Sequence, residues 1–185
     1  MCYTICLDQA AAEYLRDFNL QHVAASPLSR AIYGAKQILA QQNSQISDLR
    51  IYPGFSELDR GSWCGLTKEE IGGDMLARFD ACDETVTPKG GESYPQLKAR
   101  VLEARDKLLE ITDFGKASAI VSHLQVTRSA LSDALGIPTN KMTELKVATA
   151  SITCIDYDSV TGCQAVHFQS FKPDFGLRES KDGAN

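Results

Sequence analysis

Three side chains in this sequence have the chemical types that phosphate chemistry uses, although they lie far apart along the chain. They are Arg30, Glu57 and His123. A guanidinium can hold phosphate through two parallel hydrogen bonds, and a histidine can donate to phosphate oxygens. A carboxylic acid can give a proton to a departing alkoxide. If the fold brings them together, these residues predict a site that binds a phosphate ester and assists its cleavage.

Each of these residues also has an ordinary interpretation. Arg30 could be a surface arginine near the start of a helix, where ion pairs contribute little to stability. His123 could be a structural histidine with a satisfied ring, and Glu57 could be one more solvated acid. Taken singly, the residues do not decide between the two interpretations. The elements that position them therefore carry the argument.

Short apolar runs come just before Arg30 and His123. The runs from His22 to Ala25 and from Ala117 to Ser122 have the length and composition of buried strands. A helix is expected after each run, and the free N–H groups at a helix N-terminus favour an anion. In open α/β sheets the ligand site lies beyond the carboxyl ends of the strands. We therefore expect Arg30 and His123 to converge on one anion site.

The first of these helices is expected to start at Ser26 and Pro27. Ser26 is a good N-cap and Pro27 a good first residue, and the helix should continue to Leu39. Because Ser26 lies close to the expected anion site, we assign it to the phosphate-binding residues, together with Arg30 and His123.

The remaining patterns predict a single α/β domain. Strands that alternate with helices indicate a three-layer sandwich, a mostly parallel sheet with helices on both faces. The stretch 55–87 is rich in Gly, Asp and Glu and predicts an excursion with one or two short helices. Ser93 and Gln96 have the spacing of a capping box. We assign residues 1–172 to the domain and 173–185 to a polar tail. The other expected elements are helices at 8–18, 93–112 and 126–135, a strand at 49–52, and a hairpin of 151–157 with 164–171.

Composition limits the partners and cofactors. The 185 residues carry a formal net charge of −5 at pH 7, which argues against the broad basic surface of nucleic-acid binding. No apolar stretch has the length of a membrane helix, so a membrane is not expected as a partner. Six cysteines without a Cys-x-x-Cys pair and only three histidines predict no zinc site, and no cofactor is expected. Free thiols favour a cytoplasmic location, unless a targeting segment precedes Met1.

Four short runs, taken in order, are more specific than any single residue. They are Ser26-Pro27-Leu28-Ser29-Arg30-Ala31, the run from Phe55 to Gly65 with Glu57, Gly61 and Trp63, Pro88-Lys89-Gly90-Gly91-Glu92-Ser93, and Val121-Ser122-His123 with Arg128. In this order and spacing they resemble the histidine phosphatase superfamily, the phosphoglycerate mutase-like proteins, and in particular its phosphatase branch. The resemblance covers residues 8 to 157.

The resemblance implies a mechanism. In that family a histidine attacks the phosphoryl group and forms a phosphohistidine, and water then releases phosphate. A second histidine and two arginines bind the phosphate, and a glutamate protonates the leaving group. By the resemblance, Arg30 would be the second arginine, Glu57 the proton donor and His123 the second histidine. The implied activity is a metal-independent phosphomonoester hydrolase, and the expected partner is a small phosphorylated metabolite.

The nucleophile of the family has no match in this sequence. The family begins with a strand that ends in Arg-His-Gly, and no Arg-His pair occurs here. His22, the one histidine before Arg30, is expected at the wrong end of its strand. We therefore interpret the chain as lacking the family's first strand and expect it to be inactive as given. The alternatives are a non-catalytic member that binds phosphorylated ligands or partner proteins, and a fragment that does not fold stably alone.

Leu124 is a second departure, because the family usually has a small residue directly after the second histidine. Leu124 could narrow the pocket or turn into the core, and the sequence leaves both open. His167 alternates with apolar residues in an expected strand, and we assign it no role.

Overall fold

The fold is built on a short parallel sheet. The computed structural model describes residues 10–18, 20–42, 48–83, 85–158, 162 and 164–173. Strands β1 (Leu20–Ala25), β2 (Leu49–Ile51) and β3 (Ala117–Val121) lie in the order β2-β1-β3. Both pairings are parallel, so the carboxyl ends of the three strands meet at one edge of the sheet.

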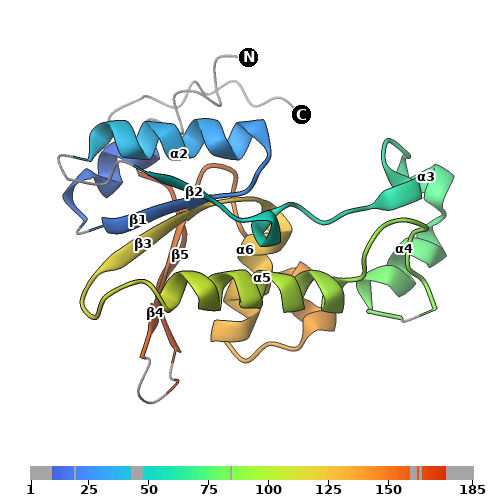
Figure 1. The fold of residues 1–185 in the computed structure, drawn as a ribbon. Coiled ribbons are helices and arrows are strands. Elements are labelled where there is room, and N and C mark those ends of the chain that lie inside the picture. The colour runs from blue at the N-terminus through green and yellow to red at the C-terminus, as the bar shows by residue number, and fades with distance from the viewer. Residues whose placement is uncertain are drawn as a thin grey trace.

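Helices cover both faces of this sheet (Figure 1). Helix α2 (Ser29–Gln41) lies on one face, and α5 (Tyr94–Leu109) and α6 (Leu124–Ala134) lie on the other. Successive side chains of a strand point to opposite faces, so β1 contributes to two cores. Val23 and Ala25 are buried on the α2 side, and Ala24 is buried on the α5 and α6 side. The predicted three-layer α/β architecture is confirmed.

The excursion predicted at 55–87 contains short helices and no strand among its described residues. They are η2 (Pro53–Phe55), η3 (Gly61–Trp63), α3 (Lys68–Ile71) and α4 (Gly73–Asp80), and α3 and α4 extend to the right in Figure 1. Phe79 of α4 is buried between Trp63 and Tyr94, with ring centroids 5.3 and 4.9 Å away. This aromatic stack ties the excursion to the start of α5.

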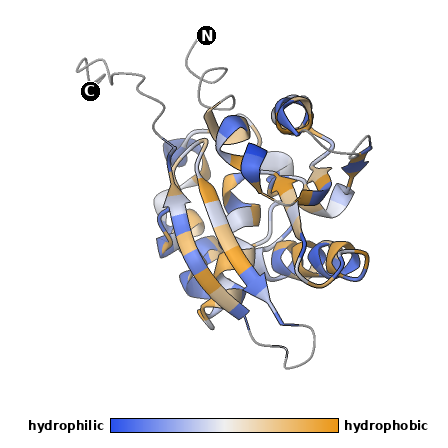
Figure 2. Ribbon diagram, turned by 90° about the vertical axis from the view of Figure 1, so that its left-hand side faces the viewer, coloured by the Kyte–Doolittle hydropathy of each residue, from blue (hydrophilic) through white to orange (hydrophobic). Residues whose placement is uncertain are grey.

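The C-terminal strands form the predicted hairpin. Strand β4 (Ile152–Tyr157) pairs antiparallel with β5 (Gln164–Phe171) in a sheet of their own. Exposure alternates along β5, and hydrophilic and hydrophobic residues alternate with it on the hairpin that faces the viewer in Figure 2. The other described elements are a helical turn at residues 10–14, η1 (Leu15–Asp17) and η4 (Thr139–Glu144). Residues 8, 9 and 174–185 of the predicted first helix and tail lie outside the described residues.

Helix boundaries differ from the prediction where side chains redirect the backbone. The expected start of α2 at Pro27 is wrong. The Ser26 hydroxyl accepts from the Leu28 N–H at 3.2 Å, and Leu28 is extended, so the helix begins at Ser29. The capping box of α5 is confirmed, with Ser93 and Gln96 each accepting from the other's backbone.

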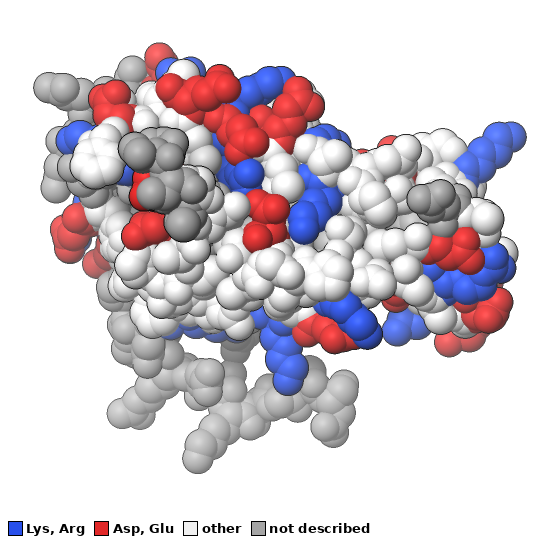
Figure 3. Space-filling model, turned by 90° about the horizontal axis from the view of Figure 1, so that it is seen from below, with Lys and Arg blue, Asp and Glu red and all other residues white. Residues whose placement is uncertain are grey.

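Charge, thiols and helix length add three observations. On the face shown in Figure 3, Lys and Arg side chains are interspersed with Asp and Glu. The described cysteines, Cys64, Cys82 and Cys154, are free thiols, and burial is the main cause that raises the pKa of Cys82 and Cys154. In the described part of the chain, no helix combines the length and hydrophobicity that a bilayer span requires.

Candidate active site

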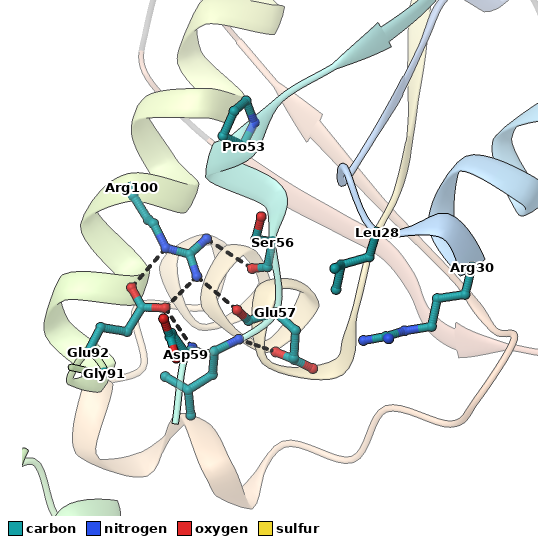
Figure 4. Close-up of a pocket in the computed structure, with 10 residues that line it drawn as sticks. Leu28, Arg30, Pro53, Ser56, Glu57, Asp59, Gly91, Glu92 and Arg100 are labelled. Atoms are coloured by element: carbon teal, nitrogen blue, oxygen red, sulfur yellow. Dashed lines mark hydrogen bonds and ion pairs between the residues drawn. The ribbon is translucent and has the colours of Figure 1, made fainter. Parts of the chain in front are cut away.

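A cavity of about 550 Å³ opens at the carboxyl ends of the parallel strands. Leu28 and Arg30 line it from the segment after β1, and the segment after β2 contributes residues from Pro53 to Asp59. Glu92 and Arg100 line the wall on the α5 side (Figure 4). Short strands and close turns thus collect charged side chains from three parts of the chain.

Arg30 and His123 come together at this edge. The Arg30 Nε donates to Nδ1 of His123 at 3.3 Å. Because Nδ1 accepts, the ring proton lies on Nε2, which is 2.8 Å from the Ser26 Oγ. Burial, followed by the positive charge of Arg30, lowers the pKa of His123. His123 is therefore a neutral imidazole at pH 7, held at both nitrogens.

Ser26 is placed differently from Arg30 and His123. It is fully buried, and its hydroxyl already meets His123 and the Leu28 N–H. Since the Ser26 hydroxyl has two partners and no exposed surface, its role in the structure is to orient the His123 ring. Its direct contact with phosphate stays a prediction.

Glu57, in the segment after η2, lines the same cavity as Arg30. Its Oε1 accepts from the Leu58 N–H at 2.8 Å, and its Oε2 lies 3.5 Å from the Gln125 N–H. The carboxylate therefore sits at the N-terminus of α6, where the helix dipole and free N–H groups favour negative charge. The structure brings all three residues of the predicted chemistry to one edge of the sheet.

Leu124 and Arg128, both on α6, have other surroundings. Leu124 is 40% exposed, so it does not turn into the core, and it is not among the residues that line the cavity. The Arg128 Nε donates to the Leu145 carbonyl at 2.8 Å, which holds η4 against α6. The other two histidines lie elsewhere: His22 meets the Ile111 carbonyl at 2.9 Å, and the exposed His167 pairs with Asp156.

Sequence reasoning missed Arg100, and it quoted Glu92 only as part of a run. Arg100 uses all five of its N–H donors. Two go to the two oxygens of Glu92, at 2.8 and 2.5 Å. The other three go to main-chain carbonyls, at 2.8, 2.9 and 3.2 Å, of Gly54, Ser56 and Glu57. In the sequence, the one signal for this ion pair is the spacing of Glu92 and Arg100 across the start of α5. This spacing resembles that of an ordinary ion pair on a protein surface.

Comparison with known proteins identifies the family. A family model described as the histidine phosphatase superfamily (branch 1) matches residues 8–169. The chain belongs to the histidine phosphatase superfamily. The sequence resemblance is thereby confirmed.

Its curated relatives are longer proteins. A bifunctional protein of Mycobacterium tuberculosis is 30% identical over 151 residues, which cover 80% of this chain and 40% of that protein. The chain thus spans well under half the length of this relative. The match therefore reports on one region of the longer protein.

Solved structures share the fold at low identity. YhfR of Bacillus stearothermophilus superposes with a TM-score of 0.77 at 20% identity, over 89% of this chain and 81% of that one. A mycobacterial glucosyl-3-phosphoglycerate phosphatase gives a TM-score of 0.75 at 22% identity, over 93% and 88% of the two chains. That phosphatase has also been solved with inorganic phosphate. These likenesses show a phosphoglycerate mutase-like fold.

Proposed function

We propose that Arg30 and His123 bind the phosphoryl group of a small phosphorylated metabolite, and that they form the phosphate site of a phosphomonoester hydrolase. The observation that carries the proposal is the contact of the Arg30 guanidinium, which lines the cavity, with the His123 ring. Arg30 and Glu57 extend toward each other across the cavity in Figure 4. A cavity of this size is within the range that holds small ligands.

Arg30 is suited to phosphate because its terminal nitrogens have no hydrogen-bond partner in the part of the chain that the structure describes. Among the residues that the structure describes, only its Nε has a hydrogen-bond partner. Arg100, in contrast, has no donor left. Of the two arginines that line the cavity, Arg30 is therefore the one that can hold phosphate oxygens through two parallel bonds.

His123 and Glu57 would serve the two ends of the scissile bond. A bound phosphate dianion favours protonation of the imidazole at Nδ1, which would then donate to a phosphoryl oxygen instead of accepting from Arg30. Glu57 would give its proton to the departing oxygen, a role that needs a carboxylic acid within reach of the leaving group. Both roles agree with those that the family resemblance implies.

The nucleophile is the part that the chain's own histidines do not supply. His22 lies four residues before Ser26 along β1, roughly 13 Å at the rise of a strand. His167 is on the separate hairpin. We propose that turnover requires a histidine that is not one of these three, as on the Arg-His-Gly strand of the family. The 185-residue chain alone would then bind phosphate esters without hydrolysing them.

The relatives support a phosphorylated small molecule as the ligand. A glucosyl-3-phosphoglycerate phosphatase and an alpha-ribazole phosphatase share the fold, and a fructose-2,6-bisphosphatase is 34% identical over 92 residues. These names describe different small phosphate esters. The shared chemistry is a phosphomonoester, and we propose that class for this chain.

A second candidate is a non-catalytic module that binds phosphorylated ligands. The observation that favours it is that, of the three histidines, His123 contacts Arg30 of the cavity wall, whereas His22 and His167 have partners elsewhere. Under this alternative the site would bind a phosphate ester and release it unchanged.

Titration calorimetry with inorganic phosphate tests the proposed site. Arg30→Ala removes charge-assisted hydrogen bonds worth about 1.5–3 kcal/mol, so affinity should fall roughly tenfold to a hundredfold. Arg16→Ala, at a side chain that is 42% exposed and pairs with Glu13, should leave affinity unchanged. Equal binding by both variants would contradict the site.

Hydrolysis of p-nitrophenyl phosphate separates the two candidates. We expect no turnover by the chain alone, and turnover when a strand ending in Arg-His-Gly precedes it. If both forms bind phosphate and neither hydrolyses the ester, the binding module is the better description.

A further inference from the structure

We infer that Arg100 and Glu92 are positioning residues that hold the Glu57 carboxylate in the cavity. The inference rests on the proposed function, because it assigns a purpose to the way Glu57 is held. The two side chains form a clamp, defined here as the Arg100–Glu92 ion pair together with its bonds to the segment 54–59. Arg100 and Glu92 are 26% and 16% exposed, so the clamp is largely sheltered from water.

The clamp fixes the backbone on both sides of Glu57. Arg100 donates to the carbonyls of Gly54, Ser56 and Glu57, and Glu92 accepts from the Asp59 N–H at 2.9 Å. The Glu92 N–H in turn donates to the Asp59 carbonyl at 3.0 Å. Carbonyls that are sheltered from water cost free energy without a partner, and Arg100 supplies a donor to three of them. The segment is thus pinned before, at and after Glu57.

A close approach to α5 makes this attachment rigid. A Cβ on Gly54 would lie 2.6 Å from the Ala104 Cβ and 2.9 Å from the Arg100 carbonyl. The segment therefore lies directly on the helix that carries Arg100. Since α5 runs for 16 residues and begins with a capping box, it gives the clamp a firm base.

The side chain of Glu57 depends on this backbone. Its own bonds are to its neighbour Leu58 and, at 3.5 Å, to the Gln125 N–H. The first moves with the segment and the second is long, so neither would hold the carboxylate once the segment is released. Among the described residues, only the clamp joins this segment to α5 by charge-assisted bonds, which are about twice as strong as neutral ones.

A double-mutant cycle read by phosphate binding tests the inference. In its ionised form the Glu57 carboxylate repels the bound dianion, so Glu57→Gln should relieve about 1 kcal/mol of repulsion and tighten the dissociation constant of inorganic phosphate about three- to tenfold. Arg100→Lys keeps the charge but cannot span the same partners with one nitrogen. It should release the segment and tighten binding by a similar factor. In Glu57→Gln, the further change Arg100→Lys should then have no effect.

Arg105→Lys is the matched control. Arg105 is also on α5, is 12% exposed and meets Asp133 at 2.6 Å, away from the cavity lining. This substitution should lower the melting temperature and leave phosphate affinity unchanged. If Arg100→Lys does not fold, Glu92→Gln replaces it in the cycle, because it weakens the clamp and keeps an acceptor for the Asp59 N–H.

The outcomes are separable from a failure of the proposed function. An unchanged affinity in Arg100→Lys, or effects of Arg100→Lys and Glu57→Gln that add, would overturn the positioning role. If Arg30→Ala binds phosphate like the parent chain, the proposed site itself is wrong, whatever the cycle gives. A loss of phosphate affinity in Arg30→Ala, together with effects of Arg100→Lys and Glu57→Gln that do not add, supports both the proposed site and the positioning role.

Discussion

Gly91 faces Gly61 so closely that neither can carry a side chain. A Cβ on Gly91 would lie 2.6 Å from the Asp59 carbonyl oxygen and 2.8 Å from the Gly61 nitrogen. Both glycines were part of runs that carried the family resemblance. Their contact lets the turn before α5 lie against the segment that follows Glu57, and the Ser62 N–H donates to the Lys89 carbonyl across the junction at 2.9 Å.

We predict that Gly91→Ala destabilises the protein. Atoms forced into a closed contact between two backbones cost about 1–3 kcal/mol and occasionally more. Gly73 is the matched control, because nothing lies within 4 Å of a Cβ there and α4 begins at this residue. Gly73→Ala should be neutral or slightly stabilising. Urea unfolding of both variants measures the difference, and equal midpoints would contradict the contact.

Ser26→Ala should affect both stability and ligand binding. The change removes the oxygen that meets His123 Nε2 at 2.8 Å and the Leu28 N–H at 3.2 Å, so a buried donor is left unpaired at a cost of about 1–3 kcal/mol. With its orienting partner gone, His123 should also bind phosphate several-fold more weakly. Thermal unfolding and phosphate titration report the two effects.

The control for Ser26→Ala is Ser129→Ala. Ser129 is equally buried, but its hydroxyl donates to the Gln125 carbonyl within the same helix. Removing it should leave phosphate affinity unchanged. A similar loss of affinity in both variants would mean that general destabilisation, rather than the orientation of His123, explains the result.

Stability should fall at mildly acidic pH because of His123. Burial and the nearby Arg30 lower its pKa in the folded state, so the unfolded chain binds more protons in this range. The stability that His123 contributes is therefore full above the ordinary histidine pKa of about 6.5 and is lost as pH falls below it. His123→Gln should flatten this part of the profile.

His167→Gln serves as the comparison for that profile. His167 is exposed and pairs with Asp156 on the hairpin, away from the cavity. Urea unfolding at a series of pH values should show that His167→Gln keeps the pH dependence of stability of the parent chain. If His123→Gln keeps the same slope as the parent chain, the buried neutral imidazole is not its source.

His123 should not become phosphorylated in the 185-residue chain. Its Nδ1 accepts from Arg30 and its Nε2 carries the proton, so neither nitrogen offers a free lone pair to a phosphoryl group. Loss of one member of a catalytic unit can cost about 10⁴ to 10⁶ in turnover. Incubation with labelled phosphate ester should give no acid-labile label. Stoichiometric label that disappears in His123→Gln would contradict this.

The sequence by itself determined the local structure and the family. Short apolar runs predicted β1 and β3, two strand-like runs around a turn predicted the hairpin, and Ser93 with Gln96 predicted the start of α5, because these signals involve neighbours in the chain. The runs around Arg30, Glu57 and His123 predicted the family, and the matching family model confirms it. The mostly parallel sheet followed from the alternation of strands with helices.

Only the tertiary structure decided which side chains meet. Arg30 touches His123 across 93 residues, and Arg100 meets the carbonyl of Glu57 across 43. The Ser26 hydroxyl closes a turn and holds His123, where the sequence indicated a helix cap. No local pattern shows which of several arginines will use every donor inside the protein. Arg100 uses every donor and Arg30 does not, because distant segments pack against α5. The spacing of residues along the chain does not show that packing.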